Sequence, residues 1–235
     1  MKRLLLILTL GVVPFLSGCY TTGLSMGEHG SFNYANFVYG LYSENKSYDK
    51  KVARPDYPIN LAVAQVGEVA PPEKMINKLN GYSNIFSSIM PISAGGDINS
   101  DYRQSYQKDS QNDQANIESR MRKMLLAAKD RGADYLFIFG GSAQYGMSYN
   151  MLSILDLTLV GTFIFPSNDI SSEGKVAGAL IEVATGRVVF EISAESELKK
   201  SYASAYANNK EGEVLKELRN TLIQDLTDKF IQKLG

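Results

Sequence analysis

A single cysteine, Cys19, follows directly on a short apolar segment at the amino terminus. Lys2 and Arg3 open the chain, and residues 4–16 are largely apolar. A basic start, a short apolar run and small residues before a cleavage point are typical of a secretory signal. The run is shorter than the roughly 20 residues that a membrane span needs, so we interpret residues 1–18 as a signal peptide. Because a lone cysteine forms no intramolecular disulfide, the fold must depend on its apolar core.

Leu16-Ser17-Gly18-Cys19 resembles the lipobox of bacterial lipoproteins. The resemblance implies that the signal is cut after Gly18 and that Cys19 becomes the first residue, carrying palmitate and further acyl chains. Two acyl chains already make a stable anchor, at about 0.8 kcal/mol per buried CH₂ group. In this family an aspartate after the cysteine retains the protein at the inner membrane, and here Tyr20 takes that position. The resemblance therefore implies an anchor in the outer membrane, with the domain facing the periplasm or exposed at the surface.

The composition indicates an ordinary globular domain behind this anchor. Apolar residues make up 44% of the chain and charged residues 21%, and the formal net charge is −1. No basic block stands out, so nucleic acid is not an expected partner. Without residues 1–18, the 235-residue chain leaves 217 residues, enough for one substantial domain. The pattern predicts a lipid-anchored tether with a short aromatic segment over residues 19–58 and a single periplasmic α/β domain over residues 59–235.

The first part of this domain predicts a β-α-β-α-β order. Alternating side chains predict a strand over residues 59–66, and residues 85–92 supply a second strand at a sheet edge. A proline pair opens a helix between them, over residues 71–80. An apolar stripe over residues 117–128 indicates the next helix, and the continuous apolar run 134–139 predicts a central strand. A right-handed crossover would make this strand parallel to the strand before the helix.

The second part predicts antiparallel strands and a long terminal helix. Glycine, serine and tyrosine over residues 140–151 indicate a loop. The apolar residues 152–165 indicate a strand, with a helical turn before it as an open alternative. Residues 175–183 and 188–194 flank a glycine-containing turn, which predicts a hairpin. Apolar residues repeat every four positions over residues 214–234, as in a helix that covers a sheet face. The predicted fold class is therefore α/β (α+β), with a single mixed sheet and packed helices. Three side chains are expected in its core: Leu136, Ile138 and Leu222.

Two short motifs resemble the periplasmic domains of the curli-secretion lipoprotein family and of the amino-terminal domain of the translocation protein TolB. Gly132-Ala133-Asp134 stands where that plan opens a core strand, and Thr185-Gly186 stands in its late hairpin. The resemblance implies a mixed α/β domain and, for the curli family, an oligomeric secretion channel. Such a channel needs two long alternating hairpins, and in this chain only residues 152–165 are apolar enough.

A second resemblance, to the rhombotarget-type lipoproteins, extends over most of the chain after the cysteine. It is carried by the lipobox, by Leu41-Tyr42 near the anchor, and by the run from Leu157 to Pro166 before the hairpin. Ser43 stands where a proline would follow in that family. The chain also lacks the glycine-glycine, apolar and basic sorting tail, so processing at the carboxyl end is not expected. The resemblance implies a fold and a location rather than a mechanism.

The residues that usually carry catalysis or bind metals are scarce. His29 is the only histidine and lies in the predicted tether, so no catalytic triad is expected. Zinc prefers histidine and cysteine ligands, which do not cluster, and the aspartates of loop 97–113 lack the compact calcium-loop spacing. The glycines after residue 139 match no nucleotide-binding motif. We therefore predict a non-enzymatic interaction or structural protein, with no catalytic residues, no metal and no cofactor.

One enzymatic alternative remains open at this stage. Glu195 and Glu197 could form the carboxylate pair of a small periplasmic hydrolase. Both would lie on one face of a strand beside Lys199 and Lys200, so a solvated strand edge accounts for them as well.

Tyrosines indicate where a partner would bind. The tyrosine side chain offers a large rigid contact area with a polar tip, which protein interfaces favour. Such residues could contact an envelope protein or a second copy of the chain, or they could fold back onto their own domain. Seven lie in the predicted tether or in predicted loops: Tyr34, Tyr39, Tyr42, Tyr102, Tyr106, Tyr145 and Tyr149.

Overall fold

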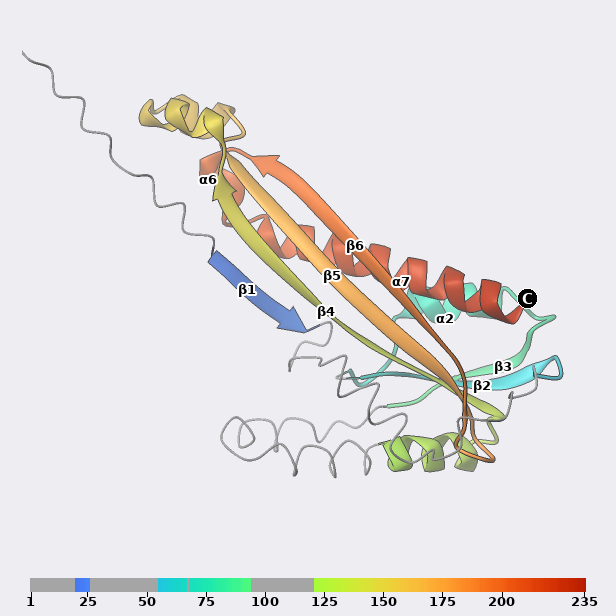
Figure 1. Cartoon of the computed structure of the whole chain (residues 1–235). Helices are drawn as coiled ribbons and strands as arrows, with labels where there is room; N and C mark the ends of the chain where they lie inside the picture. The colour runs from blue at the N-terminus through green and yellow to red at the C-terminus, as the bar shows by residue number, and fades with distance from the viewer. Residues whose placement is uncertain (1–19, 26–54, 67, 94–120) are drawn as a thin grey trace, which may run out of the picture.

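The computed structural model describes residues 20–25, 55–66, 68–93 and 121–235 (Figure 1). A six-stranded mixed sheet organises this part of the chain, and residues 121–130 form a further helix. The elements are β1 (Tyr20–Ser25), β2 (Ile59–Gln65), α2 (Glu73–Asn80), β3 (Phe86–Pro91), β4 (Tyr135–Tyr149), η1 (Met151–Leu157), α5 (Gly161–Ile164), β5 (Asn168–Glu182), β6 (Val188–Tyr202), α6 (Ser204–Ala207) and α7 (Glu211–Leu234).

The strand order is β3-β2-β4-β5-β6. β2 pairs in parallel with both β3 and β4, whereas β4, β5 and β6 pair antiparallel. The predicted class, one mixed sheet with packed helices and a long terminal helix, is therefore confirmed. β1 lies outside this path: it pairs with β4 along the edge that β2 leaves free, although the sequence places residues 20–25 in a tether.

The prediction of a loop over residues 140–151 is wrong, because β4 continues as a strand to Tyr149. Its register with β5 runs without a break from Tyr135 opposite Glu182 to Tyr149 opposite Asn168. Glycine and serine normally weaken a strand, but here pairing with β5, and with β1 over part of the length, satisfies the backbone groups. Tyr145 and Tyr149 therefore lie on a strand and not in a loop.

The prediction of a strand over residues 152–165 is also wrong, although the helical turn left open at its start is present as η1. These residues form η1, a turn and the short helix α5. β4 and β5 already pair up to Tyr149 and Asn168, so the residues between them connect two strands and have no strand beside them. The side chain of Asn150 starts η1 by accepting a hydrogen bond from the Leu152 N–H at 2.9 Å.

The predicted hairpin is confirmed, and it is longer than the sequence indicates. β5 and β6 each extend over 15 residues. Gly186 closes the turn with a φ of +70°, a left-handed conformation that favours glycine, and its N–H donates to the Glu182 carbonyl at 2.8 Å.

Two apolar layers cover the two faces of the sheet. α7 and α2 pack on one face, where Phe137, Phe139 and Leu222 belong to the larger core cluster. Residues 121–130 pack on the opposite face, over Leu136 and Ile138. Leu136, Ile138 and Leu222 are all fully buried, as predicted. α7 runs along β4, β5 and β6 for most of their length, and the chain ends at the opposite end of the sheet from η1 and α5 (Figure 1).

Candidate functional site

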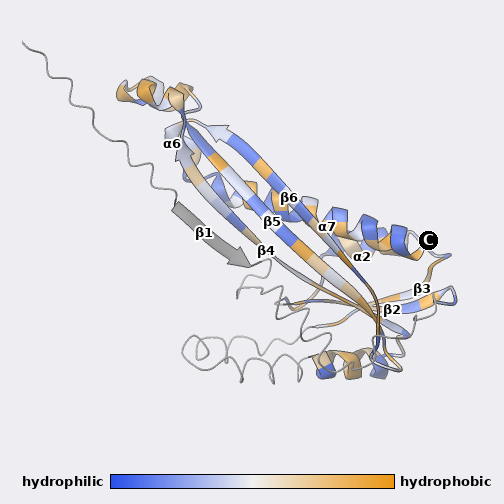
Figure 2. Ribbon diagram, viewed as in Figure 1, coloured by the Kyte–Doolittle hydropathy of each residue, from blue (hydrophilic) through white to orange (hydrophobic). Residues whose placement is uncertain are grey.

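The connection between β4 and β5 presents an unusual amount of apolar surface. We call residues 151–165 the apolar tip, since they form the far end of the long strands (Figure 2). Leu157 and Leu159 are 89% and 84% exposed, more than most polar side chains of a folded domain. Contiguous exposed apolar surface of this kind marks a protein or membrane contact. Ten large apolar side chains contribute to it: Met151, Leu152, Ile154, Leu155, Leu157, Leu159, Val160, Phe163, Ile164 and Phe165.

Short hydrogen bonds hold the apolar tip in a defined shape. The Thr158 hydroxyl donates to the Leu155 carbonyl at 2.8 Å and accepts from the Gly161 N–H at 2.9 Å. Gly161 lies so close to η1 that an added Cβ would be 1.7 Å from the Leu155 carbonyl oxygen, so only glycine fits. The Asn150 amide donates to the Pro166 carbonyl at 2.7 Å and ties the two ends of the segment together. The apolar tip therefore has a defined conformation.

The apolar tip contains one charged residue, Asp156, and its carboxylate is turned inward. Its Oδ2 accepts a hydrogen bond from the Ser204 hydroxyl of α6 at 2.5 Å. Its Oδ1 is buried and has no hydrogen-bond partner among the residues that the structure describes. Phe163 contacts Tyr206 of α6 edge to face, with ring centres 6.3 Å apart. The outward surface of the tip is therefore free of charge.

Asp169 fastens the base of the tip to the long strands. Its Oδ1 accepts from the Ser201 hydroxyl at 2.7 Å and from the Asn150 amide at 2.9 Å, and its Oδ2 lies 2.9 Å from the Lys199 ammonium. The hydrogen bond from Ser201, followed by the one from Lys199, lowers the pKa of the Asp169 carboxyl from 3.8 to about 2. One carboxylate thus links β5, β6 and the residue that caps η1.

This lowered pKa makes part of the stability pH-dependent. The charged form of Asp169 is favoured in the folded state, so its contribution is complete above pH 4 and is lost as the pH falls from about 4 to about 2. Allowing for solvent screening at Lys199, we expect Asp169→Asn to remove about 1–2 kcal/mol of unfolding free energy at pH 7 and much less at pH 2.5. Urea unfolding at both pH values measures this difference. Equal losses at the two pH values would contradict it.

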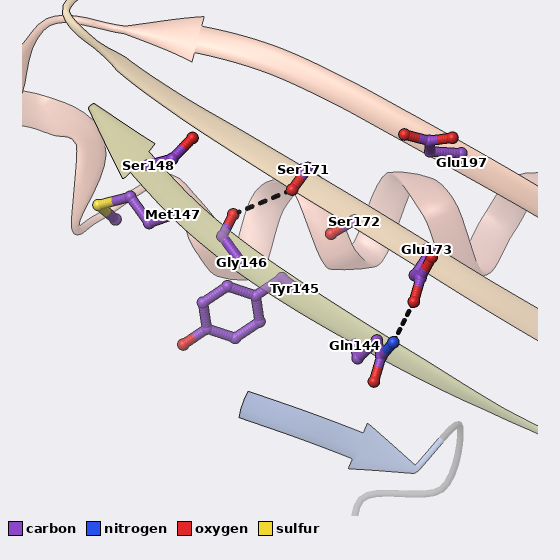
Figure 3. Close-up of a pocket in the computed structure, with 9 residues that line it drawn as sticks. All are labelled: Gln144, Tyr145, Gly146, Met147, Ser148, Ser171, Ser172, Glu173 and Glu197. Carbon is purple, nitrogen blue, oxygen red and sulfur yellow. Dashed lines mark hydrogen bonds between the residues drawn. The ribbon is translucent and has the colours of Figure 1, made fainter. Parts of the chain in front are cut away.

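The exposed face of β4 and β5 carries a shallow cavity of about 250 Å³ (Figure 3). Figure 3 shows Gln144 of β4 reaching to Glu173 of β5, which accepts its hydrogen bond. Glu173 lies directly opposite Glu197 of β6 in the strand register. Like charges in this position repel each other, and of the two carboxylates only Glu173 accepts a hydrogen bond from another residue that lines the cavity. It is lined by Gln144, Tyr145, Gly146, Met147, Ser148, Ser171, Ser172, Glu173 and Glu197.

The two glutamates of the hydrolase alternative make different contacts. Glu195 forms an ion pair with Lys175 at 3.0 Å, and both side chains are largely exposed. Glu197 faces Glu173, which sequence reasoning missed because the two are adjacent only through strand pairing. β6 is an edge strand of the sheet, and charged side chains along an edge strand prevent unwanted strand pairing.

The structure separates the two predicted contact tyrosines that it describes. Tyr149 is 71% exposed at the end of β4, beside the apolar tip. Tyr145 is half-buried and packs against the core. The remaining predicted residues lie outside the described part of the chain: Gly18, Cys19, His29, Tyr34, Tyr39, Tyr42, Tyr102 and Tyr106.

Sequence reasoning missed the apolar tip itself. The signal was present, because residues 151–165 contain ten large apolar side chains and one charge but no strand-like alternation. A continuous apolar run usually indicates a buried strand, and only the pairing of β4 with β5 shows that this run is a connection.

Comparison with known proteins gives little further information. No protein-family model matches the chain, and no curated protein matches it. The chain is similar to the crystal structure of lipoprotein GNA1162 from Neisseria meningitidis, with 14% identity over 69% of this chain and 99% of that chain and a TM-score of 0.30. A likeness of this size supports no conclusion about fold or function. The resemblances to the rhombotarget, curli-secretion and TolB families therefore stay predictions.

None of the helices in the described residues combines the length and the apolar character needed to cross a bilayer. Within the same ranges, no three or more histidine, cysteine, aspartate or glutamate side chains come together as metal ligands.

Proposed function

We propose that the chain is a lipid-anchored protein of the bacterial cell envelope, acylated at Cys19 in the outer membrane, with its domain in the periplasm. The lipobox pattern supports the acylation. The position of Tyr20, the residue after Cys19, supports it as well. Tyr20 is the first residue of β1 and lies opposite Met147, four positions before the apolar tip begins. An anchor at Cys19 would thus join the domain at its apolar end, and this observation carries the proposal.

The domain behind the anchor acts, in this proposal, through binding rather than catalysis. Of the two carboxylates that could act in a hydrolase, Glu195 forms an ion pair and Glu197 lies opposite the like charge of Glu173. Tyr149 and the polar face of β4 and β5 offer contact surface for an envelope protein or a second copy of the chain. The tyrosines outside the described residues stay candidate contacts. Among the residues that the structure describes, no specific contact favours the hydrolase or the secretion channel.

The anchor is tested by labelling cells with a clickable fatty acid. We expect the wild-type chain to carry the label and Cys19→Ser to lose it completely, because serine lacks the thiol that accepts the first lipid group. Thr22→Ser, an equally small change three residues later, should keep the full label. Equal labelling of the wild type and Cys19→Ser would overturn the proposal.

A further inference from the structure

We propose that the apolar tip inserts into the lipid layer that holds the anchor and forms a second membrane contact. This inference rests on the proposed acylation at Cys19. It assigns a lipid surface to residues 151–165. Neither the predicted contact tyrosines nor the cavity on β4 and β5 accounts for the exposed apolar side chains of these residues.

The position of β1 brings the anchor and the tip to the same end of the sheet. β1 runs antiparallel to β4, from Tyr20 opposite Met147 to Ser25 opposite Ser142, so its first residue is the one nearest the tip. Strands rise about 3.4 Å per residue, which places the start of η1 roughly 14 Å beyond Met147. Cys19 lies one further residue along the chain, a step of about 3.8 Å. Each distance is shorter than the roughly 15 Å that one leaflet contributes to the hydrocarbon core, so the acyl chains and the tip can enter one leaflet together.

The chemistry of the tip fits the boundary between headgroups and acyl chains. Burial of a charge or of an unpaired polar group in lipid is costly. The only charged side chain is Asp156: its Oδ2 accepts a hydrogen bond from Ser204, and its Oδ1, which has no hydrogen-bond partner among the described residues, is buried inside the protein. The hydroxyls of Thr158 and Thr162 donate to carbonyls within the tip. The surface that would meet lipid is therefore formed by leucine, isoleucine, valine, methionine and phenylalanine. Since no exposed charge takes part, the contact should depend little on salt or on anionic lipid.

A lipid surface accounts for the tip better than a protein partner does. The exposed side chains lie on η1, on α5 and on the residues beside them, at a projecting end of the molecule (Figure 1). Protein interfaces usually surround their apolar centre with a polar and charged rim, which residues 151–165 lack. The anchor would also hold the tip at the membrane whether or not a partner is present.

The test uses the full chain, which contains no tryptophan, so one introduced indole reports on its own surroundings. Leu157→Trp places the reporter at the tip, and Tyr82→Trp, between α2 and β3, is the control at the opposite end. Each protein is purified from membranes, its acyl chains are verified by intact mass, and it is reconstituted in phosphatidylcholine vesicles. With brominated lipid, we expect loss of most of the tryptophan emission in Leu157→Trp and almost none in Tyr82→Trp.

A second pair of variants excludes an effect of the introduced indole. Phe163→Trp moves the reporter to α5, and adding Leu157→Ser and Leu159→Ser removes apolar area from two of the most exposed positions without touching the core. We expect the added serines to reduce quenching of the residue-163 reporter severalfold at both low and high salt. Undiminished quenching would overturn the inference.

The outcomes distinguish this inference from the proposed anchor. An acylated protein whose Leu157→Trp emission escapes brominated lipid overturns tip insertion and leaves the anchor standing. Emission that shifts with protein concentration but not with brominated lipid overturns it in favour of a second copy. A protein without acyl chains refutes the anchor, and quenching after its addition to preformed vesicles would then support the tip alone.

Discussion

Replacing Phe230 with alanine is expected to lower the free energy of unfolding by about 3–5 kcal/mol, the usual cost of removing a buried aromatic ring. Phe230 lies on α7 and is fully buried. Its ring stacks on Phe137 of β4 with centres 4.0 Å apart and contacts Phe86 of β3 and Phe190 of β6 at 6.2 and 5.9 Å. The change would therefore remove ring contacts between α7 and three strands at once.

Urea unfolding followed by circular dichroism measures this loss. Leu126→Ala is the matched control, because Leu126 is 53% exposed on the helix over residues 121–130 and should change stability by less than about 0.5 kcal/mol. Similar losses in the two variants would mean that α7 does not pack on the sheet through Phe230.

Gly178→Ala is expected to destabilise the protein by about 1–3 kcal/mol, although alanine usually suits a strand better than glycine. An added Cβ at Gly178 would lie 2.7 Å from the Phe137 ring and 3.0 Å from the Phe139 Cβ. Phe137 is held between α7 and the sheet by its stacking on Phe230, so it cannot move aside without cost. The gain of about 0.4–1 kcal/mol that glycine-to-alanine changes bring through the unfolded chain is therefore outweighed.

Gly212→Ala provides a control of opposite sign. Gly212 lies in the first turn of α7, and nothing would approach its added Cβ within 4 Å. Alanine there should stabilise the protein by about 0.4–1 kcal/mol. Thermal or urea unfolding of both variants decides the matter, and stabilisation by Gly178→Ala would contradict the close packing of β5 on Phe137.

Local patterns predict the elements whose side chains repeat with a regular period. β2, α2, β3, the hairpin and α7 follow from alternation, from prolines and glycines, and from the four-residue repeat of α7. The second half of β4 could not be found in this way, because long-range pairing with β5 outweighs the local preference of Gly140 and Gly141 for a loop. The apolar tip was missed for the same reason. The apolar run of residues 151–165 predicts a core strand, and only the pairing of β4 with β5 shows that it is a connection.

The candidate contact residues, too, can be predicted from the sequence only in part. Composition singles out tyrosines, but it cannot tell Tyr149, which is exposed beside the tip, from Tyr145, which packs against the core. Alternation along β4 separates the two only when the strand and its buried face are known. Glu173 and Glu197 come together solely through the register of β5 and β6.

The length of β4, β5 and β6 gives the molecule reach. Fifteen residues in each strand correspond to about 50 Å, well above the thickness of a bilayer's hydrocarbon core. α7 braces this span on one face, so the strands form a stiff spacer rather than a flexible arm (Figure 1). The long strands therefore hold the apolar tip at a fixed distance from β2, β3 and α2, which lie toward the other end of the molecule (Figure 1).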